Sequence, residues 1–587
     1  PAGFVDLDFR VEKAPGEKEP FVVREALFTA RSSDASCHIF PYRVKELTGA
    51  VEFDANGVFL RNLCGVHDSA RVCVNGWMEA PHRTALAKLS ISGMDVPIDD
   101  ELLTALHPRE QRWIEEFGLA GRFDADISIT RARSAHEAHP APWDTAVNLA
   151  FNDLISTYAK VPVPVTHLAG RASIHSDRLE VSQARGELGT GSIQLQGFAD
   201  MQDRNLKELS FQIAADDLRI DREVLAALPP EISARLTPFN VTGCVSFESD
   251  LSYNPTAGWH HESLARLRNM ELTPDDFPLP IGGALADLRM VSDNVEIVRA
   301  RGFYKDAELF AKGRIDLGTS DEVDLVVEAE DLPIDQQFRD AAPLSLCEAL
   351  AGWIIEQPID AEIRVQKPGH HVTWNGRAQL TDATIHHRSL PRALENVQAS
   401  ISFTNDEVHC TQARAEYAGA SLDADFSVAQ EDSARRGQIR IGAKGLSLDD
   451  SIRGLLPTDA QRVWDELSPS GRMDLAVDDL SFYRADRSQP ATWSVRGQAH
   501  PQGVKLSDHD VVIERGRVSF EGMLVDRLGG VTLNGNLQDA AVTLYGQQLN
   551  ETSASWYLAR TAAGQGRAAL GEFHGRVHGG TATTQAQ

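Results

Sequence analysis

Residues 191–228 read GSIQLQGFADMQDRNLKELSFQIAADDLRIDREVLAAL, and their order of apolar and polar residues indicates the local structure. Apolar and polar residues alternate from Ile193 and again from Leu209. A period of two is typical of a strand with one apolar face and one solvated face. Asp221 then precedes apolar residues at helical spacing, and an aspartate in that place accepts hydrogen bonds from first-turn N–H groups. The stretch therefore predicts successive strands followed by a short helix with an aspartate cap.

The same pattern recurs along the chain. Its helix-cap aspartates are separated by 122, 114 and 114 residues, and these are Asp99, Asp221, Asp335 and Asp449. Four tryptophans follow with separations of 116, 115 and 119 residues, namely Trp143, Trp259, Trp374 and Trp493. Two independent markers with one spacing indicate an internal repeat of about 115 residues.

We therefore predict four repeat units and a partial fifth. Their expected bounds are 1–150, 151–270, 271–385, 386–500 and 501–587, and the last ends in a frayed tail. No linker rich in Pro, Ser or Gly separates the units, which favours a continuous stack over separate domains. The predicted fold class is mainly β: an elongated, curved antiparallel sheet, or repeating β-groove, with one short Asp-capped helical segment in each unit.

The alternating apolar residues form the candidate site. In an open, curved sheet they would line a trough suited to an acyl chain, and in a closed sandwich they would be ordinary core. Alternation alone does not distinguish these two cases. The candidate lining residues are Leu89, Ile91, Ile193, Leu195, Leu209, Phe211, Ile213, Val323, Leu325, Val327, Ile439 and Ile441.

The composition excludes several classes of function. The chain has 587 residues, with 57 Lys and Arg against 85 Asp and Glu, and a net charge of −28. So negative a balance argues against nucleic acid, because phosphate neutralisation needs clustered cations. No run approaches the roughly 20 apolar residues that cross a bilayer. The chain begins at Pro1 without a leader pattern, so we expect a piece of a longer protein or one whose targeting segment was removed.

The six cysteines, Cys37, Cys64, Cys73, Cys244, Cys347 and Cys410, contain no C-x-x-C pair. Zinc, iron–sulfur and thioredoxin-like sites therefore lose their main support. Only Cys64 and Cys73 are close enough in sequence to suggest a cross-strand contact. The favoured interpretation is that all six are buried free thiols, which leaves the compartment undecided.

No catalytic or metal-binding pattern stands out. The sequence has no G-x-S-x-G elbow and no phosphate-binding P-loop. The histidine doublets, such as His260-His261, lie in predicted strands or loops, and on a strand neighbouring side chains point to opposite faces. The four aspartates are interpreted as helix caps, and the tryptophans as packing within the repeat core. We expect no enzyme activity, no metal and no cofactor.

One repeated sequence pattern resembles that of a known family. It runs from Leu168-Ala-Gly170 through Leu179-Glu-Val181 to the strand Gly191-Ser-Ile-Gln-Leu-Gln-Gly197. This succession of strand, glycine turn and Leu-x-Leu-x-Gly strand resembles the AsmA-like family of bacterial envelope proteins, which includes the TamB and YhdP relatives. The resemblance covers nearly the whole chain.

That resemblance implies a location and a function. It implies a periplasmic protein of the cell envelope, anchored in the inner membrane by an N-terminal helix outside this chain. It implies a hydrophobic β-groove, like that of bridge-like lipid transfer proteins, that carries phospholipid between the inner and outer membranes. The expected partners are phospholipid or another acyl lipid, membranes through segments outside this chain, and envelope proteins. The alternative is a structural or adaptor protein, a repeat scaffold for outer-membrane biogenesis without a lipid groove.

Overall fold

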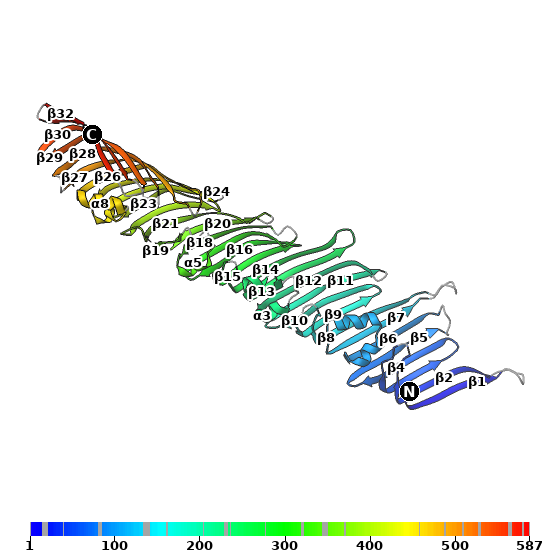
Figure 1. Ribbon diagram of the computed structural model, residues 1–587. Helices are drawn as coiled ribbons and strands as arrows, with labels where there is room; N and C mark the ends of the chain where they lie inside the picture. The colour runs from blue at the N-terminus through cyan, green and yellow to red at the C-terminus, as the bar shows by residue number, and fades with distance from the viewer. Residues whose placement is uncertain are drawn as a thin grey trace. The chain divides into compact units, whose positions relative to one another are not determined.

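The protein is described by a computed structural model (Figure 1). It describes residues 2–585 except 14–20, 39, 80–84, 133–140, 160–162, 203–204, 228–232, 235, 276, 319–321, 343–349, 369–370, 432, 457, 487–488, 507–509, 526–529, 561–565 and 578–579. Cys347 lies outside the described residues. Strands take up 74% of the chain and helices 8%, which confirms the predicted mainly-β class.

The chain divides into two compact units, with the boundary inside strand β16. Unit 1 comprises Pro1–Asp275 with Gly282–Val298, and unit 2 comprises Asp276–Ile281 with Arg299–Gln587. The strands up to the boundary are β1 (Ala2–Lys13), β2 (Phe21–Ala35), β3 (Val44–Phe53), β4 (Gly57–His67), β5 (Ala70–Glu79), β6 (Ala87–Pro97), β7 (Arg122–Arg131), β8 (Trp143–Ser156), β9 (Val165–His175), β10 (Arg178–Leu188), β11 (Gly191–Gln202), β12 (Asn205–Ile220), β13 (Thr242–Asn254), β14 (Gly258–Leu272), β15 (Ile281–Val291) and β16 (Asn294–Tyr304). The helices of unit 1 are α1 (Asp100–Ala105), α2 (Pro108–Glu116), α3 (Arg222–Ala227) and the 3₁₀ turn η1 (Thr237–Phe239).

Unit 2 is likewise built mainly of strands with a few short helices. Its strands are β17 (Ala307–Asp316), β18 (Val323–Leu332), β19 (Trp353–Ile355), β20 (Ile359–Lys367), β21 (Thr373–His387), β22 (Leu394–Thr404), β23 (Glu407–Tyr417), β24 (Ala420–Glu431), β25 (Ala434–Ser447), β26 (Pro469–Arg484), β27 (Thr492–Leu506), β28 (Val511–Val525), β29 (Gly530–Leu544), β30 (Gln547–Arg560), β31 (Gly566–Val577) and β32 (Gly580–Gln585). Its helices are α5 (Gln336–Ala341), α7 (Asp450–Arg453) and α8 (Thr458–Leu467).

Within each unit the strands form an open antiparallel sheet. Most strands pair with their sequence neighbours, as Figure 1 shows by the steady progress of colour from strand to strand. The short β19 is an exception, because it pairs with β21 while β18 pairs with β20. The sheet is curved and does not close on itself, so the closed-sandwich interpretation of the alternating residues is wrong. Residues 581–585 fall in the tail that was expected to be frayed at 581–587, but they pair with β31 as part of strand β32.

Many strands carry a β-bulge near one end. The register shifts between Val181 and Ala184 in β10, and between Ala215 and Leu218 in β12. The extra residues Gln183 and Asp217 have φ of 55° and 57°. Because a bulge adds one residue, it reverses the alternation, so that residues of opposite parity on its two sides share a face. Bulges also bend strands, which gives the sheet its curvature.

The bulges account for part of the acidic composition. A bulged N–H lies outside the strand ladder and needs another acceptor. The N–H of Asp95 donates to the carboxylate of Asp124 at 2.8 Å, and the N–H of Gln412 donates to that of Asp425 at 2.7 Å. In both cases the acceptor comes from the neighbouring strand. Some of the excess carboxylates are therefore structural acceptors.

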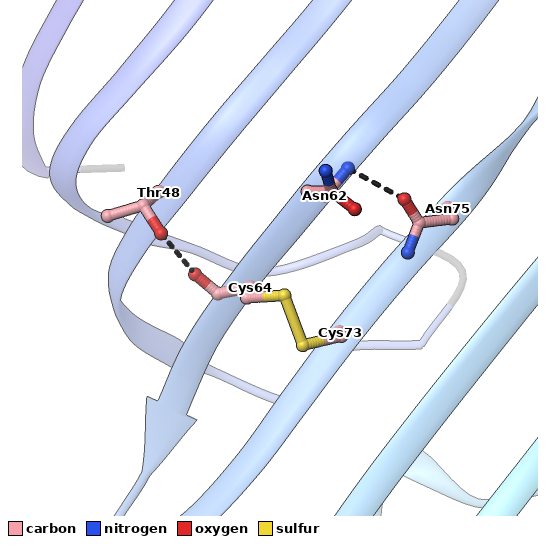
Figure 2. Close-up of a disulfide and its surroundings, with 5 residues drawn as sticks. All are labelled: Thr48, Asn62, Cys64, Cys73 and Asn75. Carbon is pink, nitrogen blue, oxygen red and sulfur yellow. Dashed lines mark hydrogen bonds between the residues drawn. A yellow bond between two sulfur atoms is a disulfide. The ribbon is translucent and has the colours of Figure 1, made fainter.

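A disulfide joins two neighbouring strands of unit 1. Figure 2 shows the bond between Cys64 in β4 and Cys73 in β5, with an S–S distance of 2.18 Å. It also shows the bulged N–H of Asn62 donating to Asn75 Oδ1 at 2.7 Å. The expectation of free thiols is therefore wrong for this pair, because a hairpin places the two residues directly opposite each other. Cys37, Cys244 and Cys410 are free, and only Cys410 among them is buried.

Candidate functional site

In each unit, buried clusters join helices to one face of the sheet, which we call the helix-bearing face. In unit 2, Phe338 of α5 packs in a buried cluster with Ala329 and Leu332 of β18 and Leu380 of β21. In unit 1, Leu102 of α1 belongs to a corresponding cluster. These closed cores occupy the end of the face beside the bulges, and we call this part the helix-covered end.

The predicted lining residues occupy the same face beyond the helix-covered end. All twelve are partly exposed, and none belongs to the fully buried core. We call the part of the helix-bearing face that they mark the open stretch. In unit 1 it includes Leu89 and Ile91 in β6, Ile193 and Leu195 in β11, and Leu209, Phe211 and Ile213 in β12. In unit 2 it includes Val323, Leu325 and Val327 in β18, and Ile439 and Ile441 in β25.

Strand register joins these residues to further apolar neighbours. Leu195 of β11 pairs with Ile213 of β12, and Phe211 of β12 pairs with Leu251 of β13. Leu325 pairs with Val365, and Ile439 pairs with Leu480. The apolar residues of β11 and β12 therefore continue into β13, those of β18 into β20, and those of β25 into β26.

The repeated tryptophans lie at the far end of this face, opposite the helix-covered end. Trp259 pairs with Tyr253 and Trp493 with Phe482, with ring centroids 5.0 Å apart in both pairs. Trp143 and Trp259 are 49% and 60% exposed. The expectation that the tryptophans pack in a repeat core is therefore wrong for these two. They form part of an aromatic rim on the helix-bearing face, defined by Trp143, Trp259, Trp374 and Trp493.

One polar cluster interrupts the apolar face of unit 1. Ser263 Oγ lies 2.9 Å from Ser249 Oγ and 2.7 Å from His261 Nε2. Both serines are buried, and Ser249 pairs with Ile213 of the open stretch. His260 is exposed on the opposite face, so this doublet does not present both rings to one ligand. The three polar groups satisfy one another's hydrogen bonds.

The aspartates act at the helix N-termini. Asp99 accepts from the N–H of Leu102, and Asp335 from that of Phe338, both at 2.8 Å. Asp221 accepts from the N–H groups of Glu223 and Val224, and Asp449 from that of Ser451. Each thereby satisfies first-turn donors that have no partner within the helix.

A second side chain at three of these helix starts comes from a β-hairpin. His67 Nε2 lies 3.0 Å from Asp99 Oδ2, and the hydroxyl of Tyr304 donates to Asp335 Oδ1 at 2.9 Å. The hydroxyl of Tyr417 donates to the carbonyl of Ser451 at 3.1 Å. We call these the hairpin–cap contacts. The sequence patterns did not predict these contacts, although positions 67, 188, 304 and 417 repeat with nearly the spacing of the aspartates.

Charge strengthens the hairpin–cap contact between Tyr304 and Asp335 in unit 2. Burial disfavours the Asp335 carboxylate, but hydrogen bonds from Lys305, the Phe338 N–H and Tyr304 outweigh it and lower the pKa of Asp335. Burial, followed by the hydrogen bond to Asp335, raises the pKa of the Tyr304 hydroxyl. The Asp335 carboxylate therefore holds β16 and α5 together in its ionised form.

Asp335→Asn should make unit 2 less sensitive to acid. Because the folded-state pKa is lowered, the ionised carboxylate stabilises the fold above the unfolded-state pKa of about 3.9, and this contribution is lost as pH falls through the folded value. We expect the variant to be about 1–2 kcal/mol less stable at pH 7. The difference in melting temperature between the variant and the unaltered protein should narrow as the pH falls from 5 to about 3. Asp306→Asn, at an exposed carboxylate of the adjacent turn, is the control. A gap that stays constant over this range would contradict the assignment.

Comparisons with known proteins add no identification. No family model and no curated protein matches this chain. No helix in the described residues has the length and apolar character that a membrane crossing requires.

Proposed function

We propose that this protein is a non-enzymatic lipid carrier of the bacterial cell envelope, a member of the AsmA-like group. Its open stretch would bind the acyl chains of phospholipid and carry them along a β-groove between the inner and outer membranes. The observation that carries this proposal is the continuity of partly exposed apolar residues from strand to strand on one face.

The chemistry of this face suits hydrocarbon better than a polar ligand. An acyl chain gains about 0.8 kcal/mol for each methylene removed from water. The helices cover one end of the face, and the exposed tryptophans lie at the other. Indole rings favour places where hydrocarbon meets water, so the aromatic rim suits the level at which an acyl chain emerges from the face.

The proposed compartment agrees with the cysteine chemistry. The Cys64–Cys73 bond joins the neighbouring strands β4 and β5 of a hairpin. Disulfides persist mainly in oxidising compartments, and the bacterial periplasm is one of these. The bond supports a periplasmic location, with the anchoring helix of the proposal supplied by sequence outside this chain.

A transfer assay tests the proposal. The full chain should accelerate movement of fluorescent phospholipid from donor to acceptor vesicles, and native mass spectrometry of the gently extracted protein should detect bound lipid. The protein treated with delipidating detergent and then reloaded serves as a control for copurified membrane. Absence of both bound lipid and transfer would reject lipid transport and favour the scaffold alternative.

A further inference from the structure

The hairpin–cap contact of unit 1 has an excess of negative charge. In unit 2, the residue after Tyr304 is Lys305, and its ammonium forms an ion pair with Asp335. The corresponding residue after His67 is Asp68. The position that supplies a cation to one helix cap therefore supplies a second carboxylate to the other.

The hydrogen bonds of His67 require a cation at its second nitrogen. Nδ1 lies 2.7 Å from the carbonyl oxygen of Arg43, which only accepts, so Nδ1 carries hydrogen. Nε2 lies 3.0 Å from Asp99 Oδ2, which as a carboxylate oxygen also only accepts. A neutral imidazole would direct its lone pair at that oxygen. Either a second proton or a metal ion must separate the two atoms.

A buried hydroxyl beside His67 has no partner. The ring of Tyr42 packs 4.2 Å from the imidazole, and its side chain is only 5% exposed. Its hydroxyl makes no hydrogen bond. Burial raises the pKa of Tyr42, and the charges of Asp99 and Asp68 raise it further, as expected for a phenol beside these carboxylates. Buried hydroxyls are rarely left unpaired, so this one indicates a missing polar ligand such as a metal-bound water.

Arg122, the arginine whose charge reaches Tyr42, is already engaged with other residues. Arg122 bonds to Asp95 Oδ2 at 3.0 Å and to Ser69 Oγ at 2.5 Å. Glu101 adds negative charge, with Oε2 3.7 Å from His67 Nδ1. The charge of Asp68, Asp99 and Glu101 thus exceeds what one imidazolium could balance.

We propose that His67 Nε2, Asp68 and Asp99 Oδ2 bind a divalent transition-metal ion of the Zn²⁺ type. Their ligand atoms all lie within 4.8 Å of one another. Zn²⁺ bonds of about 2.1 Å at tetrahedral angles place ligand atoms about 3.4 Å apart, so a small outward movement of the Asp99 carboxylate from its 3.0 Å separation from His67 Nε2 would admit the ion. One imidazole with two carboxylates suits Zn²⁺, whereas Mg²⁺ prefers an all-oxygen shell.

The proposed ion would fasten the β4–β5 hairpin to helix α1. The Nδ1–H of His67 donates a hydrogen bond to the carbonyl oxygen of Arg43. Such a bond is the usual support for a metal-bound histidine, because it fixes the ring and the tautomer. This role is structural and does not depend on lipid binding.

Calorimetric titration of the full chain with Zn²⁺, after removal of metal with EDTA, tests the site. We expect one Zn²⁺ per chain, a higher melting temperature with Zn²⁺, and no comparable response to Mg²⁺. Asp68→Asn should weaken binding about tenfold or more and remove the thermal shift. Asn suits this position because Asp68 has φ of 52°, a conformation that Asn readily adopts. Asp306→Asn, in the corresponding hairpin of unit 2, should bind Zn²⁺ as the unaltered protein does.

Two results would overturn the proposal. If the unaltered chain binds no Zn²⁺, a proton alone occupies Nε2 of His67. If Asp68→Asn binds Zn²⁺ as tightly as the unaltered chain, the ion is held elsewhere.

Discussion

Replacing Phe211 by Asp should reduce phospholipid binding about 50-fold while the protein stays folded. Phe211 is partly exposed, its strand neighbours on this face are Gly197 and Leu251, and its ring covers Gly197, which leaves no room for a side chain. A carboxylate here reaches water in the lipid-free protein, so its cost to folding is small. In the lipid complex it would displace about three methylenes from apolar contact, a loss of about 2.4 kcal/mol.

Gln212→Asp is the matched control. Gln212 is the next residue of β12, is exposed on the opposite face, and bonds to Gln196 at 2.7 Å. It receives the same added charge on the same strand. Binding of a fluorescent phospholipid and the melting temperature should be measured for both variants. Unfolding of the Phe211 variant, or equal lipid binding by the two variants, would contradict an open apolar site.

Replacing Phe338 by Ala should destabilise unit 2 by about 3–5 kcal/mol. Phe338 is 6% exposed and meets Phe277 edge to face, with the ring centroids 6.0 Å apart. It joins α5 to the buried cluster of β18, β20 and β21. Its removal leaves a cavity that the hydrogen-bonded strands around it cannot fill by relaxation. Urea unfolding followed by tryptophan fluorescence measures the loss.

Phe303→Ala provides the comparison. Phe303 lies in β16 next to the buried Tyr304, but it is 37% exposed, with the guanidinium of Arg301 over its ring. We expect a cost of about 1 kcal/mol or less for this variant. Equal losses in the two variants would show that the helix-covered end is not the main source of stability in unit 2.

The local features of the fold followed from the sequence because they depend on short-range patterns. The alternation in β11 and β12 predicts two strands with one apolar face, and Asp221 marks the start of α3. Openness could not be predicted in the same way, since Ile193 and Leu195 have the same alternation in a closed sandwich. It depends on bulges such as that at Asp217, which a sequence pattern shows only as a change of phase.

The contacts missed at the candidate sites join residues that are distant in sequence or chemically ambiguous. Cys64 and Cys73 become a bonded pair only when the β4–β5 register sets them opposite each other. His67 meets Asp99 because a hairpin reaches a helix start. The repeat spacing of the hairpin positions was the available signal. It was obscured because the residue itself changes among His67, Leu188, Tyr304 and Tyr417.

Photo-cross-linking along β12 tests whether phospholipid binds to the helix-bearing face of the sheet. A benzophenone amino acid is placed singly at each position from 209 to 213, and each full-length protein is irradiated with radiolabelled phospholipid. Positions 209, 211 and 213 lie on the helix-bearing face, and 210 and 212 on the other. We expect labelled lipid adducts at the three odd positions and none at the two even positions. Equal labelling at all five positions, or labelling at the even positions alone, would contradict this expectation.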